Sequence, residues 1–259
     1  NFKVGGLARY GLAYEDLAPL SPRLVYLSIS AFGQDGPAAA EPGYDAMIQA
    51  MGGLMSITGV PEGEPGAGPQ KVGVAVADLM CGMYAVAAVL AALNERHDSD
   101  RGQFIDLSLL DTQVAWLANQ NLNYLVSGEA PARRGTAHPN IVPYQAFRTA
   151  DGFLMLAVGN DAQFTRFCAV AGAAELATDP RFATNQDRVA HRGELVPLVE
   201  AILRKRTRAA WLVDLRKARV PRGPINDIAQ VFAEPQVRHR QLRINPTHPL
   251  AGSVPGVRR

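Results

Sequence analysis

The sequence predicts an α/β protein in which the second half of the chain forms a smaller α+β unit. Through residues 1–127, short apolar runs rich in β-branched and aromatic residues alternate with longer helical stretches. This alternation is typical of a parallel sheet with crossover helices. From residue 144 onward the pattern changes to one hairpin followed by helices. With 47% hydrophobic and 19% charged residues, the chain has the composition of a soluble globular protein.

The clearest element of the first half is the apolar run at residues 24–30, which predicts a buried parallel strand. It leads into the loop 32–37, and ligands tend to bind at the carboxyl ends of strands in open α/β sheets. Gly- and Pro-rich stretches separate the remaining elements. These are helices at residues 14–20, 45–56, 79–96 and 110–126, and strands at residues 71–77 and 103–107.

The second half begins with a predicted hairpin, residues 144–149 and 153–158, joined by an Asp-Gly turn. Asn160 or Asp161 is expected to cap a helix that stops at Gly172, because these residue types favour the two ends of helices. Further helices are expected at residues 185–206, at residues 208–218 after a Thr207 cap, and as two short segments within 227–241.

Charge, cysteine content and hydropathy exclude several classes of protein. A net charge of +2 does not favour binding to nucleic acid. Cys81 and Cys168 lie among apolar residues without zinc spacing, so we expect neither a metal nor a disulfide, and a cytoplasmic location. Residues 72–93 are apolar except for Asp78, and a lone carboxylate is costly inside a bilayer. We therefore expect a buried helix and no membrane association.

Asp78 is the first candidate for chemistry, because it stands where a strand is predicted to meet a helix. Capping that helix is the commoner role for such a residue. A carboxylate at the positive end of a helix dipole also stays ionised, as a nucleophile must, and Gly82 leaves room for a ligand nearby. Tyr44 and Asp45 have ordinary roles as a half-buried aromatic and a helix cap. His138 is either a surface hydrogen-bonding group or an acid, base or ligand.

Several segments together resemble the family III CoA-transferases, the group that includes formyl-CoA transferase and carnitine CoA-transferase. Each segment is weak evidence alone, but their order and spacing also match along nearly the whole chain. The segments are Asn1-Phe2-Lys3, Arg9-Tyr10-Gly11-Leu12, residues 21–26, residues 28–37, Pro42-Gly43-Tyr44-Asp45, residues 53–59, Ala77-Asp78, residues 101–106, His138-Pro139-Asn140-Ile141, residues 149–152 and residues 221–227.

The resemblance implies a Rossmann-like large domain at residues 1–127, a linker at 128–143 and a small α+β domain at 144–241. Residues 242–259 are then a return segment to the large domain. Two such chains are expected to interlock as a homodimer. The resemblance also implies that the first strands of the large domain, with much of the CoA pocket, belong to a part of the protein before Asn1.

The resemblance further implies covalent catalysis. Asp78 would attack an acyl-CoA to give a mixed anhydride, and CoA thiolate would then form an aspartyl-CoA thioester. By position, the residues that contact CoA are Asn1, Phe2, Arg9, Tyr10 and Tyr44. Arg9 is suited to pairing with a CoA phosphate. His138 is a candidate substrate contact.

Two departures from the family pattern bear on the substrate. Tyr44 stands where the α-methylacyl-CoA racemases of the superfamily carry His, and loss of that proton-transfer group favours a transferase. Residues 135–141 replace the Gly-rich loop of formyl-CoA transferases, which disfavours formate and oxalate and favours dicarboxylates such as succinate or glutarate. Two alternatives remain: a racemase or epimerase that uses Asp78 with a base such as His138, and a non-catalytic scaffold.

Overall fold

The structure, a computed structural model, describes residues 2–258 of the chain. The chain divides into two compact units, Asn1–Gly135 and Thr136–Arg259. The boundary between the units falls within the predicted linker at residues 128–143.

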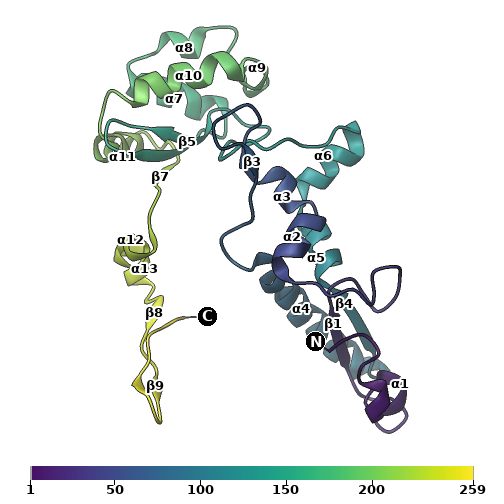
Figure 1. The fold of residues 1–259 in the computed structure, drawn as a ribbon. Coiled ribbons are helices and arrows are strands. Elements are labelled where there is room, and N and C mark those ends of the chain that lie inside the picture. Colours follow the sequence, from purple (N-terminus) through teal and green to yellow (C-terminus); the bar gives the residue numbers. More distant parts are fainter. Residues whose placement is uncertain (1, 259) are drawn as a thin grey trace. The chain divides into compact units, whose positions relative to one another are not determined.

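The first unit combines short strands with helices of very different length (Figure 1). Its elements are the 3-10 helix η1 (Ala8–Tyr10), α1 (Tyr14–Leu17), β1 (Tyr26–Ser30), α2 (Asp45–Met51), α3 (Leu54–Ile57), β2 (Gly59–Val60), β3 (Gly68–Pro69), α4 (Val76–Ser99), β4 (Phe104–Ser108), α5 (Leu109–Trp116) and α6 (Asn119–Ser127).

A parallel pair of strands, β1 and β4, confirms the strands predicted at residues 24–30 and 103–107. The register runs from Tyr26 opposite Phe104 to Ser30 opposite Ser108. Tyr14 of α1 packs against Tyr26 and Phe104 at the start of both strands, with ring centroids 6.0 and 5.4 Å apart. The carboxyl ends of both strands therefore open at the opposite edge, towards α2 and the start of α5.

The strand predicted at residues 71–77 is wrong. These residues pair with no strand in the described part of the chain, and α4 begins at Val76 rather than after Asp78. The backbone is held instead by the wholly buried side chain of Gln49, whose Oε1 accepts the Val72 N–H at 2.9 Å. An alternating apolar pattern alone could not reveal that a side-chain amide replaces a neighbouring strand.

Three predicted helices are interrupted. The helix predicted at 45–56 stops at Gly52, and Gly53 takes a positive φ of 84° before α3 begins. The helix predicted at 110–126 breaks at Ala118, which also has a positive φ, between α5 and α6. The helix predicted at 185–206 divides at His191. In each case one residue with non-helical backbone dihedrals ends the first helix or separates it from the second.

α4 is long and apolar enough to cross a membrane by length and composition, although 28% of its most apolar stretch is buried within the structure. Its inward face carries Val76, Ala77, Cys81, Ala85 and Ala92. The outward face carries four large apolar side chains, each more than half exposed: Leu79, Met83, Val86 and Leu90. The expectation of a buried helix is therefore met on one face of α4 and is wrong on the other.

The second unit is built on the three-stranded antiparallel sheet β5-β6-β7 and its helices (Figure 1). The hairpin of β5 (Tyr144–Arg148) and β6 (Phe153–Ala157) confirms the prediction, and the third strand, β7 (Arg222–Pro224), was not predicted. The helices are α7 (Asp161–Ala171), α8 (Glu175–Thr178), α9 (Asn185–Ala190), α10 (Arg192–Leu203), α11 (Arg208–Lys217), α12 (Ile228–Ala233) and α13 (Pro235–His239).

The core of the second unit lies between this sheet and helices α7, α10 and α11. Phe147, Leu154, Phe164, Leu195 and Trp211 are all essentially inaccessible to solvent. The predicted caps are present: the side chain of Asn160 accepts the Gln163 N–H at the start of α7, and that of Thr207 accepts the Ala210 N–H at the start of α11.

The final segment of the chain forms two small antiparallel pairs that were not predicted. β8 (Arg243–Ile244) pairs with β11 (Gly256–Val257), and β9 (Thr247–His248) pairs with β10 (Gly252–Ser253). Strands of two residues have almost no periodicity, so the sequence pattern could not predict them.

Candidate active site

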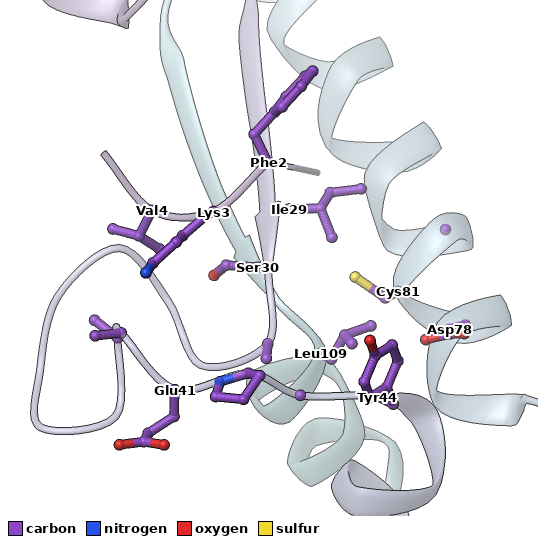
Figure 2. A pocket seen from close by; sticks show the side chains of 16 residues that line it. Phe2, Lys3, Val4, Ile29, Ser30, Glu41, Tyr44, Asp78, Cys81 and Leu109 are labelled. Carbon is purple, nitrogen blue, oxygen red and sulfur yellow. The ribbon is translucent and has the colours of Figure 1, made fainter. Parts of the chain in front are cut away.

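A cavity of about 920 Å³ lies in the first unit at the carboxyl edge of the β1–β4 pair. Ile29 and Ser30 at the end of β1 line one wall, and Asp78, Cys81 and Gly82 of α4 line another. Figure 2 shows Asp78 and Cys81 projecting from α4, with Tyr44 on the same side of the cavity. The full lining is Phe2, Lys3, Val4, Ile29, Ser30, Ala31, Ala39, Ala40, Glu41, Pro42, Gly43, Tyr44, Asp78, Cys81, Gly82 and Leu109.

The loop that closes the cavity requires a glycine. A Cβ atom at Gly43 would lie 2.4 Å from the Cβ of Ala31, which follows β1, and 3.6 Å from Ile48 of α2. The close approach of residue 43 to Ala31 brings Tyr44 to the end of β1 and starts α2 directly beside it. The close contact with Ala31 therefore explains why the second residue of the Pro-Gly-Tyr-Asp sequence is a glycine.

Asp78 lies in the first turn of α4 and does not cap it. The residue before the helix, Ala75, has no side-chain acceptor. Asp45 of α2 supplies one instead: its Oδ1 accepts the Ala77 N–H at 2.8 Å and, at a longer 3.4 Å, the Asp78 N–H. The expectation that Asp78 serves as the cap is therefore wrong, and Asp45 caps a helix 32 residues further along the chain rather than its own.

The Asp78 carboxyl forms no hydrogen bond or ion pair with any residue that the structure describes. Removal of water from around the group, and then the negative charge of Asp45, raise the pKa of Asp78 above its ordinary value. A carboxylate that is neither paired nor stabilised by donors is a stronger base and nucleophile than one that is.

Cys81 lies one helical turn beyond Asp78, with its thiol towards the cavity (Figure 2). Burial raises the pKa of this thiol, an effect that the hydrogen bond with Thr112 partly offsets and the charge of Asp78 reinforces. The thiol therefore stays protonated and unreactive at neutral pH. Cys81 forms a small, weakly polar wall beside the carboxylate.

The predicted CoA contacts fall into three groups. Phe2 and Tyr44 line the cavity, and Tyr44 is 77% exposed. Arg9 and Tyr10 lie in η1, outside the cavity lining, with the guanidinium 4.6 Å from the centre of the Tyr10 ring. Asn1 lies outside the described residues.

His138 belongs to the second unit, where two contacts hold its ring. Its ring stacks on Tyr144 with centroids 5.1 Å apart, and its Nδ1 accepts the Asn140 N–H at 3.1 Å. Arg192 holds the same loop by donating to the carbonyls of His138 and Pro139. Burial, and then the charge of Arg192, lower the pKa of His138. At neutral pH the ring is therefore neutral, with its proton on Nε2.

Sequence reasoning missed several groups of the cavity. Lys3, Glu41 and Ser30 line it, and Cys81 lies beside Asp78. Cys81 could have been found, because a residue three positions after Asp78 shares its helix face. Lys3 belongs to the Asn1-Phe2-Lys3 segment of the resemblance but was assigned no role, and no pattern indicated Glu41; both residues come from irregular segments. In the described part of the chain, no group of three or more His, Cys, Asp or Glu residues could hold a metal ion.

A carboxyl that has no hydrogen-bond partner among the described residues and lines a cavity is suited to covalent group transfer. The chain belongs to CoA-transferase family III: the sequence pattern of that family matches residues 1–259.

Among curated proteins, the chain is 51% identical over 258 residues to succinate–glutarate CoA-transferase from Agrobacterium fabrum and 41% identical over 258 residues to succinyl-CoA:glutarate CoA-transferase from Homo sapiens. The matches cover 100% and 99% of this chain, and 64% and 58% of those proteins. It is also 40% identical to acetyl-CoA:oxalate CoA-transferase from Acetobacter aceti, over 94% of this chain and 62% of that protein.

Among solved structures, a CAIB/BAIF family protein from Brucella suis is 48% identical and superposes with a TM-score of 0.83. The match covers 100% of this chain and 66% of that one. The chain thus spans a little under two thirds of the length of these relatives.

Proposed function

We propose that the complete protein carrying this chain transfers CoA from an acyl-CoA donor such as succinyl-CoA to a dicarboxylate acceptor such as glutarate. The observation that carries the proposal is the Asp78 carboxyl, which lines a cavity of about 920 Å³ without a hydrogen-bond partner among the described residues. Family membership and the names of two close relatives support both the reaction and the dicarboxylate.

Asp78 acts in this proposal as a nucleophile that is regenerated. Its carboxylate oxygen attacks the thioester carbonyl of the donor, and CoA thiolate leaves, which gives a mixed anhydride. The thiolate then attacks the Asp78 carbonyl carbon, releasing the donor acid and leaving an aspartyl-CoA thioester. The acceptor carboxylate repeats both steps in reverse. The net reaction exchanges two carboxylates and consumes no proton.

The side chains around Asp78 suit this sequence of steps. The protonated Cys81 thiol and the apolar residues Ile29 and Leu109 give a weakly polar wall, which limits hydrolysis of the anhydride and thioester. Lys3 provides a cation for an anionic part of the substrate. His138 belongs to the second unit, and we propose it only as a contact for a carboxylate oxygen of the substrate acid, because its ring is neutral and has an N–H to donate.

Further parts of the proposal concern the whole enzyme. We propose a Rossmann-like large domain, a return segment at residues 242–259 and an interlocked homodimer in the cytoplasm. A two-stranded parallel pair is rarely stable by itself. That rarity and the exposed apolar face of α4 support the presence of further chain around the first unit. The free, buried thiols of Cys81 and Cys168 suit a reducing compartment.

A screen of donors against acceptors tests the function. The complete protein is incubated with succinyl-CoA and, in turn, glutarate, oxalate or formate. The acyl-CoA products are then identified by mass spectrometry. We expect glutaryl-CoA as the main product, and none from the Asp78→Ala variant. Full turnover by that variant would refute the role of Asp78. A main product from oxalate would move the substrate assignment to the oxalate enzymes, to which this chain is also similar.

A further inference from the structure

The first turn of α4 has its backbone donors taken by a residue from another helix. Ala77 and Asp78 offer two of the N–H groups that have no partner within a helix. Both are directed at Asp45 Oδ1, at 2.8 and 3.4 Å. Asp45 therefore supplies the side-chain acceptor for these two groups at the start of α4, and the Asp78 carboxylate does not.

Asp45 is fixed in place by a second side chain. Its Oδ2 accepts from Gln49 Nε2 at 2.7 Å, one helical turn further along α2. Gln49 is completely buried and also binds the segment before α4, through the Val72 N–H at 2.9 Å and the Val74 carbonyl at 3.4 Å. The carboxylate of Asp45, the amide of Gln49 and the start of α4 therefore form one continuous network.

This network determines the chemical state of Asp78. Hydrogen bonds from helix N–H groups stabilise a carboxylate and make it a weaker nucleophile. With those donors occupied by Asp45, the Asp78 carboxylate is left with the cavity as its surroundings (Figure 2). The charge of Asp45 acts in the same direction, because it repels electrons on Asp78 that a covalent bond to an acyl carbon would share.

We propose that Asp45 is a positioning residue for Asp78: it caps α4 in place of Asp78 and thereby keeps the Asp78 carboxylate unpaired and reactive. The inference rests on the proposed function, since it concerns the reactivity of the same carboxylate. Tyr44, the neighbour of Asp45, lines the cavity, but Asp45 itself does not, and it touches no substrate in this scheme.

The charged groups near Asp78 determine how the acylation rate of an Asp45 variant should depend on pH. The titratable or charged side chains of the cavity lining are Lys3, Glu41, Tyr44 and Cys81, beside Asp78 itself. Asp45 lies outside this lining, but its negative charge raises the pKa of Asp78, as the second cause after desolvation. Replacing Asp45 by Asn removes the charge but keeps an oxygen that can accept the Ala77 N–H. The acid limb of the acylation rate should therefore move to lower pH.

The experiment measures the rate at which the complete protein forms its acyl adduct from succinyl-CoA, as a function of pH, by rapid quench and mass spectrometry. For Asp45→Asn we expect the acid limb at lower pH and a plateau rate reduced about 10-fold. For Asp45→Ala, which also loses the cap, we expect a loss on the order of 10²-fold. Gln49→Leu removes the hydrogen bond that holds the Asp45 carboxylate. It should also move the acid limb to lower pH and reduce the plateau rate, but by less than Asp45→Asn.

Asp16→Asn is the matched control. Asp16 Oδ2 accepts the Ala13 N–H at the start of α1, which packs at the opposite end of β1 from the cavity. This variant should keep the rate and pH profile of the wild type.

An unchanged acid limb and plateau in both Asp45→Asn and Gln49→Leu would overturn the inference, and if Asp45→Asn does not fold, Gln49→Leu decides. A variant that only melts earlier, with the wild-type pH profile, would reduce Asp45 to a structural cap. Absence of any adduct in the wild type would instead refute the proposed function.

Discussion

At the scale of single residues, the candidate site depends on which carboxylate takes the hydrogen bonds at the start of α4. Asp45 takes them and Asp78 does not. The same feature that makes Asp78 reactive also makes it mildly costly, because a carboxylate partly shielded from water near another negative charge disfavours the folded state when both are ionised. The cavity is thus a place where stability and reactivity oppose each other.

Replacement of Asp78 by Asn tests that opposition. The raised pKa of Asp78 means that the folded state holds this proton more tightly than the unfolded chain does. Stability contributed by that proton is complete at acid pH and is lost as the pH rises from the ordinary Asp pKa through the raised one. We therefore expect Asp78→Asn to melt at the same or a higher temperature than the wild type at neutral pH.

Thermal melts of both proteins at neutral and acid pH provide the measurement. The difference in melting temperature should shrink below the ordinary pKa of Asp, where wild-type Asp78 is itself neutral. A variant less stable than the wild type at neutral pH would mean that the carboxylate makes stabilising contacts in the complete protein.

At the scale of elements, the site results from three element ends that meet: the carboxyl end of β1, the start of α4 and the start of α5. Ser30 opposite Ser108 closes the parallel register, so Leu109 enters the cavity immediately after β4 ends. The arrangement follows the general rule that ligands bind beyond the carboxyl ends of parallel strands.

Gly82 tests whether this cavity holds the substrate. It lies on α4 one turn after Asp78 and lines the cavity, and a Cβ atom added to it would meet no other atom within 4 Å. Gly82→Ala should stabilise α4 by up to about 1 kcal/mol through helix propensity, with a near-normal KM for acyl-CoA. Gly82→Leu should share that stability but raise KM at least about 10-fold, because its side chain fills the cavity.

Steady-state kinetics and thermal melts on the pair of Gly82 variants separate the two effects. An unchanged KM in a folded Gly82→Leu enzyme would show that acyl-CoA binds elsewhere.

At the scale of the whole molecule, the outward face of α4 needs a covering. Leu79, Met83, Val86 and Leu90 form a continuous stripe at spacings of four, three and four residues. A soluble surface rarely exposes so large an apolar patch, and such patches usually mark contacts with other chain segments. The part of the relatives that this chain does not span, or the second subunit of the proposed dimer, would provide such a covering.

Met83→Glu tests that expectation in the complete protein. If the face is covered, the buried charge should destabilise the fold by more than about 2 kcal/mol or disrupt the oligomer. If it is exposed, the effect should stay within about 0.5 kcal/mol. Ala91→Glu, exposed on the flank of the same helix, is the control. Denaturant unfolding measures the change in stability, and light scattering measures the oligomeric state. A Met83→Glu protein that behaves like the Ala91→Glu control would contradict a covered face.

The parts of the fold that could be predicted are those where one local pattern decides the structure. The strands at 24–30 and 103–107, the Asp-Gly hairpin and the Asn160 cap all follow from adjacent residues. The strand at 71–77 could not be rejected, because only the buried amide of Gln49 shows what its backbone binds. Likewise, the contact between Asp45 and the start of α4 joins residues 32 apart, which no spacing rule reaches.

Formation of a covalent adduct on Asp78 is the central claim, and the most direct measurement is its trapping. The complete protein is mixed with succinyl-CoA, quenched with hydroxylamine, digested and sequenced by tandem mass spectrometry. We expect a hydroxamate on Asp78, increasing with donor concentration and absent in Asp78→Ala. A modified Asp45 or Glu41 in its place, or CoA transfer at full rate with Asp78 unmodified, would contradict the assignment.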